Sequence, residues 1–125
     1  MVQPVDSPQR CAMSVSNRLV DGALIAEVGG VVDMVTAPTL TDHLLTAVET
    51  APAALVIDLT HVDFLTAAGL GVLVGTHDAA ADTTAVVVVA DGPVTHRPIV
   101  LTGVDREVPV YATVTVALAA LHADG

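Results

Sequence analysis

The side chains able to act as nucleophiles are few and gather near the amino terminus. All three serines, Ser7, Ser14 and Ser16, precede residue 17, and the single cysteine is Cys11. Covalent catalysis needs a nucleophile held inside a structured site next to a base. The chain offers none so placed. A lone cysteine also excludes an intramolecular disulfide and a multi-cysteine metal cluster, which leaves a bystander thiol or an intermolecular disulfide or redox thiol as the alternatives for Cys11.

The groups that could act as acids, bases or metal ligands are scattered. His61 and Asp63 make the nearest approach to a metal site, but two ligands across a loop seldom suffice. The glutamates Glu27, Glu49 and Glu107 fall in unrelated segments, so no acid and base are paired. We therefore expect a protein that is not an enzyme and needs no metal or other cofactor.

A glycine-rich run raises one further kind of chemistry, the binding of a nucleotide phosphate. Gly69, Gly71 and Gly75, with Asp91 placed 22 residues after the first, resemble a dinucleotide-binding fingerprint. The last glycine comes one residue late, and nine residues separate Gly69 from an expected strand end at Leu59. A purine-nucleotide-binding module therefore stays a minor alternative.

Composition limits the fold that could position any of these residues. The 125 residues suffice for one domain, and with 53% apolar but only 2% aromatic residues the core must consist of Val, Leu, Ile and Ala. A net charge of -10 without any lysine disfavours nucleic acid and anionic membrane surfaces as partners. No apolar run approaches the roughly 20 residues that span a bilayer. We expect a cytoplasmic protein.

The chain divides into a short lead-in and one domain. Residues 1–12 lack apolar periodicity and an apolar signal-peptide core, which predicts a disordered lead-in, with Met13 as an alternative start to Met1. The remaining residues, 13–125, read as a single unit.

Within that unit, hydrophobic periodicity and turn signals alternate between strand and helix. Asp21-Gly22 predicts a tight hairpin, Thr36 is the N-cap candidate of the first helix, and Pro52 ends that helix. The predicted strands are 13–20, 23–32, 54–59, 85–90 and 108–111, and the predicted helices are 38–49, 66–80, 98–103 and 113–122. This order indicates an α/β fold in which strand, helix and strand form a parallel, right-handed crossover.

Three segments in this order resemble the STAS domains of the anti-sigma-factor antagonist family. The first is Gly30-Val-Val-Asp33 followed by Thr36-Ala-Pro38, the second is Leu55-Val-Ile-Asp-Leu59 with Val62-Asp-Phe-Leu65 and Gly69-Leu-Gly-Val-Leu73, and the third is Leu101-Thr-Gly-Val-Asp105 with Pro109-Val-Tyr111. The resemblance implies a STAS-type fold from residue 13 onward, with a mixed, mostly parallel sheet of four to five strands flanked by about four helices. It also implies binding to an anti-sigma factor, often a serine kinase, so that a sigma factor is released.

The resemblance also locates a regulatory position. In the family, a serine at the start of the second helix is phosphorylated to break the complex, and the matching segment here is Thr66-Ala-Ala-Gly69. The acceptor position is Ala67, which has no hydroxyl, so the usual switch is expected to be absent. Thr66 is the alternative acceptor, and its favoured role is to cap the helix with its side chain.

The partner-binding residues that the resemblance implies lie around this loop: Asp33, Thr66, Ala67, Ala68, Gly69 and Leu70. On its residues alone, Asp33 is equally well explained by an Asx turn, and an exposed Leu70 would favour a partner contact. Close packing on the sheet is the favoured explanation for Gly71 and Gly75, with a partner's helix as the alternative. STAS domains also regulate transport complexes, which is the other functional alternative.

Overall fold

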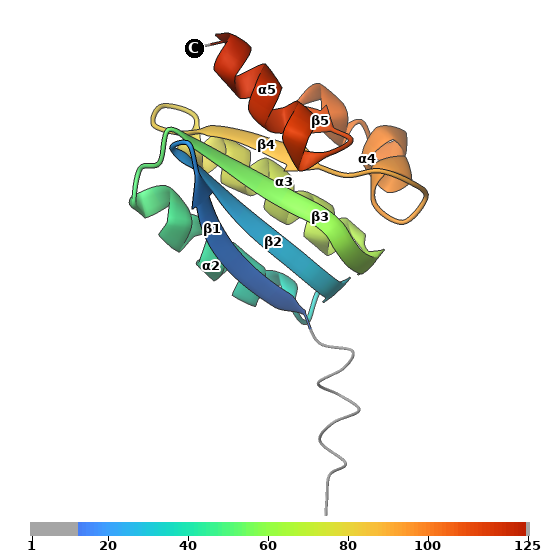
Figure 1. The fold of residues 1–125 in the computed structure, drawn as a ribbon. Coiled ribbons are helices and arrows are strands. Elements are labelled where there is room, and N and C mark those ends of the chain that lie inside the picture. Colours follow the sequence, from blue (N-terminus) through green and yellow to red (C-terminus); the bar gives the residue numbers. More distant parts are fainter. Residues whose placement is uncertain (1–12, 125) are drawn as a thin grey trace, which may run out of the picture.

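The computed structural model describes residues 13–124, so the expected lead-in and Cys11 lie outside the described residues. Strands and helices alternate along the chain as the periodicity predicts (Figure 1). The strands are β1 (Ser14–Val20), β2 (Ala23–Val32), β3 (Ala54–Leu65), β4 (Ala85–Val89) and β5 (Val110–Tyr111), and the helices are α2 (Ala37–Glu49), α3 (Ala67–Ala80), α4 (His96–Thr102), the 3-10 turn η1 (Val104–Arg106) and α5 (Val114–Asp124).

One five-stranded sheet, in the order β1-β2-β3-β4-β5, forms the centre of the fold. β1 runs antiparallel to β2, and the other neighbours are parallel. The hairpin turn is made by Asp21 and Gly22, whose φ angles of 52° and 84° match the left-handed conformations that a two-residue hairpin favours. The predicted α/β fold, with a mixed and mostly parallel sheet, is confirmed.

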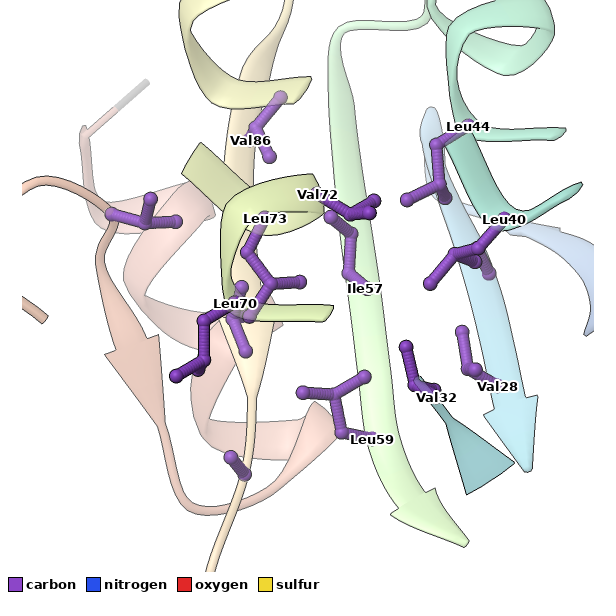
Figure 2. Close-up of a cluster of buried hydrophobic side chains, with 14 of the residues drawn as sticks. Val28, Val32, Leu40, Leu44, Ile57, Leu59, Leu70, Val72, Leu73 and Val86 are labelled. Carbon is purple, nitrogen blue, oxygen red and sulfur yellow. The ribbon is translucent and has the colours of Figure 1, made fainter. Parts of the chain in front are cut away.

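Helices cover both faces of the sheet. Alternation along β3 sends Leu55 and Ile57 into the cluster beneath α2 and α3, and Ala54 and Val56 into the cluster beneath α5. Figure 2 shows leucine side chains of α2 and α3 converging on Ile57. These two aliphatic clusters fix the strand ends from which the loops at the carboxyl edge of the sheet emerge.

Several element boundaries differ from prediction. β3 continues to Leu65 rather than stopping near Leu59, because its second half pairs with β2 through two register shifts although several of its side chains are exposed. α4 begins at His96, two residues before Pro98, which its first turn tolerates because the amides there have no helical partner. The last strand is confined to Val110–Tyr111. None of the helices in residues 13–124 is long and apolar enough to span a bilayer.

Candidate functional site

Two loops meet at the carboxyl edge of the parallel strands. The β2–α2 loop follows Val32 and the β3–α3 loop contains Thr66, and the pairing of Val32 with Leu65 brings the two strand ends side by side. The amide of Thr66 donates to the carbonyl oxygen of Val32 at 3.0 Å, and the Thr66 hydroxyl donates to the same oxygen at 3.2 Å. Thr66 therefore joins the two loops.

The contacts of Thr66 correct its predicted capping role. Thr66 occupies the N-cap position of α3 with extended backbone, φ −100° and ψ 177°, but its side chain accepts no hydrogen bond from the first helical turn. Its hydroxyl donates across the sheet edge instead, because the carbonyl of Val32 ends β2 beside it. Whether this hydroxyl can accept a phosphate stays a prediction.

The β2–α2 loop is organised by the side chains of Asp33 and Thr36. The Asp33 carboxylate accepts hydrogen bonds from the amides of Val35 at 2.9 Å and Thr36 at 3.0 Å, which confirms the Asx turn. The Thr36 hydroxyl donates to the carbonyl of Val31 at 2.8 Å and accepts from the amide of Asp33 at 3.0 Å. Thr36 is thus the N-cap residue of α2, as predicted, but its hydroxyl faces β2 and makes no capping hydrogen bond to the helix.

These hydrogen bonds also set the charge of the loop. The Thr36 amide, and to a lesser extent the Val35 amide, hold the pKa of the Asp33 carboxyl below its ordinary value, although desolvation acts in the opposite direction. The Asp33 carboxyl group is therefore ionised at neutral pH, and its hydrogen bonds hold the charge in one position. It is half-exposed, so a contact with a partner is compatible with its structural role.

The start of α3 divides into an exposed part and a buried part. Ala67 is exposed and Ala68 half-buried, whereas Gly69 and Leu70 are buried. A Cβ at Gly69 would lie 2.6 Å from Leu65 Cδ1 and 2.7 Å from Val32 Cγ1, so glycine is needed there for the helix to approach the sheet. Leu70 is only 7% exposed and belongs to the core (Figure 2).

A partner contact was expected of Leu70 only if its side chain were exposed, and the structure buries it. The accessible side chains of the predicted set are those of Asp33, Thr66, Ala67 and Ala68.

Gly71 and Gly75 have a different environment from the one predicted. Both are exposed, and no heavy atom lies within 4 Å of a Cβ added at either position. Close packing on the sheet is therefore the wrong explanation for them. They line a groove of about 390 Å³ between α2 and α3, together with Ala68 and Leu45.

The structure shows an exposed apolar pair in the β2–α2 loop that the sequence-based prediction missed. The side chains of Met34 and Val35 are 80% and 79% exposed. With Asp33, Thr66, Ala67 and Ala68 they line a shallow hollow of about 470 Å³, which we call the loop hollow. Two apolar residues between a strand and a helix were the available signal, because neither element's periodicity buries them.

The structure also bears on the two chemical alternatives. No group of three or more His, Cys, Asp or Glu residues within residues 13–124 could hold a metal ion. Because β3 reaches Leu65, α3 follows its strand almost directly, which removes one of the two spacing objections to a phosphate-binding turn; the late glycine at residue 75 remains. However, Gly69 faces Leu65 and Val32 in the core, so no space is left on that side of the helix for a phosphate to bind.

Comparisons with known proteins agree with this geometry. The model of the STAS domain matches residues 14–117. The chain is 34% identical over 114 residues to the anti-sigma-F factor antagonist RsfB of Mycobacterium tuberculosis, covering 91% of this chain and 92% of the relative.

Solved structures give the same result. The crystal structure of an anti-sigma factor antagonist from Mycobacterium paratuberculosis superposes with a TM-score of 0.85 at 41% identity, over 89% of this chain and 95% of that one. SpoIIAA in its unphosphorylated form shares the fold, with a TM-score of 0.70 at 14% identity over 88% of this chain and 97% of that one. The chain thus belongs to the STAS domain proteins of the anti-sigma factor antagonist family, which are regulators rather than enzymes.

Proposed function

We propose that this protein binds an anti-sigma factor through the two joined loops and so releases a sigma factor. The observation that supports this most directly is the loop hollow, where exposed Met34, Val35 and Ala67 adjoin the carboxylate of Asp33. Exposed apolar side chains beside a fixed charge are typical of a protein-docking surface. The similarity to RsfB over 91% of the chain supports the class of partner.

We further propose that serine-type phosphorylation does not control this complex. Ala67, the first residue of α3, is exposed but has no hydroxyl. The neighbouring hydroxyl of Thr66 donates to the Val32 carbonyl, so a kinase would have to break that hydrogen bond to use it as an acceptor. Without a phosphate charge of about -1.5 to -2 at this loop, phosphorylation has no means of weakening the contact with the partner.

The experiment combines binding and phosphorylation in one assay. The purified protein is mixed with the anti-sigma factors of its own organism and with the M. tuberculosis anti-sigma-F factor, with and without radiolabelled ATP. We expect a complex that survives ATP and carries no label. The matched variant Ala67→Ser restores the hydroxyl with little change in volume, and we expect it to gain label wherever the bound factor is a kinase.

Two outcomes would revise this proposal. Label on the wild type that disappears in Thr66→Ala would move the acceptor to Thr66, and the absence of a complex with every factor would refute the antagonist function. We expect the protein to act in the cytoplasm, where sigma factors are used. No feature of the described residues favours the alternative of a transport-complex regulator.

A further inference from the structure

Met34 is the most exposed large apolar side chain of the described residues, and it lies in the loop hollow beside Ala67. We propose that Met34 is a site of reversible oxidation, at which conversion to the sulfoxide releases the anti-sigma factor. This inference rests on the proposed function and adds a means of control where the phosphoacceptor is missing.

The position of Met34 makes it accessible to an oxidant. Its side chain is 80% exposed, whereas Met13, the other methionine among the described residues, is partly buried against the main core. The turn that carries Met34 is held by the hydrogen bonds of Asp33 to the amides of Val35 and Thr36. The thioether is therefore presented to solvent by an ordered turn.

The same exposure makes Met34 an anchor for the partner. Met34 and Val35 together leave an apolar surface in water next to the loops that the partner is proposed to contact, and burying such side chains drives association. Asp33 is the one charged residue lining the hollow, and its carboxylate is ionised at neutral pH. The matching surface of the anti-sigma factor is therefore an apolar recess with a lysine or arginine at its rim.

The chemistry is a transfer of one oxygen atom. Hydrogen peroxide gives an oxygen to the thioether sulfur, so that an S–O bond forms, the O–O bond breaks, sulfur is oxidised by two electrons and peroxide is reduced to water. The sulfoxide is polar and chiral, and burying it without a hydrogen-bond donor is unfavourable. Methionine sulfoxide reductases reverse the step with electrons from a thiol.

The test compares the wild type with Met34→Leu before and after treatment with hydrogen peroxide. The leucine variant keeps an apolar side chain of similar volume but has no thioether, and it retains Met1, Met13 and Cys11, so oxidation at those residues affects both proteins equally. Peptide mass spectrometry measures sulfoxide at residue 34, and calorimetry measures the dissociation constant for the anti-sigma factor.

We expect the oxidised wild type to bind about tenfold more weakly, as for loss of an interface anchor. Peroxide should not change the affinity of Met34→Leu from its own untreated value. Methionine sulfoxide reductase should restore the affinity of the oxidised wild type. The inference would be overturned if oxidised and untreated wild type bound with equal affinity, or if peroxide weakened binding by Met34→Leu as much as binding by the wild type. In either case the antagonist function stands. Failure of the untreated wild type to bind any anti-sigma factor would overturn the proposed function itself.

Discussion

Replacing glycine by alanine at neighbouring positions of α3 tests how that helix sits on the sheet. Gly71 lies in the helix interior, and a Cβ there would meet no heavy atom within 4 Å. The substitution Gly71→Ala should therefore add only the gain in helix propensity. We expect its free energy of unfolding to rise by about 0.5–1 kcal/mol.

Gly69→Ala makes the same chemical change where the space is already filled. The new Cβ would lie 2.6 Å from Leu65 Cδ1 and 2.7 Å from Val32 Cγ1. The leucine terminus can rotate away, but the β-branched valine is stiff at χ1, so the helix must move off the sheet. Overpacking of this kind costs about 1–3 kcal/mol, which exceeds the propensity gain near a helix start. We expect a net loss of stability of about 1 kcal/mol.

Equilibrium unfolding in urea, followed by circular dichroism, measures both changes. The slopes of the transitions should agree between variants, so that the midpoints report stability alone. Gly75→Ala is a second internal control, because its Cβ also has open space. A Gly69→Ala protein as stable as the wild type, or a destabilised Gly71→Ala protein, would refute this account of the helix.

Three further predictions concern the loops and their support. Ala67→Asp places a charge in the docking surface and should weaken binding to the anti-sigma factor about tenfold in calorimetry, while thermal stability changes little. Asp33→Asn should be less stable than the wild type at pH 7, and the difference in stability should vanish in acid. The reason is that folding lowers the pKa of Asp33 from 3.8. The stabilisation by the carboxylate is therefore complete above pH 3.8 and is lost as the pH falls through the pKa of the folded state. Urea midpoints between pH 7 and pH 2 check this, and a constant difference would contradict it. Thr84→Val should lower the free energy of unfolding in urea by about 1 kcal/mol, because the buried Thr84 hydroxyl donates a hydrogen bond to the Pro52 carbonyl at 2.9 Å. An unchanged urea midpoint would argue against that contribution.

Local patterns were enough to predict the α/β class and the order of strands and helices, and the family resemblance added the STAS-type fold. The Asp21-Gly22 turn predicts the hairpin, and the short apolar runs predict the central strands, because both signals act through nearby residues. The end of β3 could not be predicted in this way. Its second half contains exposed polar side chains and is held by backbone pairing with β2, which no local pattern records.

The candidate site was predictable in place but not in detail. The resemblance located the loop at Thr66 and Ala67, and the residue types explained Asp33 as an Asx turn. The Thr66 hydroxyl, however, bonds to a carbonyl 34 residues away in the chain. Glycine is needed at residue 69 of α3 because the side chain of Val32, on β2, occupies the space that a Cβ would fill. Such contacts depend on tertiary packing, as does the exposure of Met34.

The central claim is that this chain binds an anti-sigma factor through an intact loop surface that phosphorylation does not switch. The most direct measurement is sedimentation velocity of the protein mixed with candidate anti-sigma factors, with and without ATP, alongside mass analysis of the chain. We predict a complex that persists with ATP and a chain of unchanged mass. A complex that dissociates on addition of ATP with the gain of one phosphate, or no complex at all, would contradict the claim.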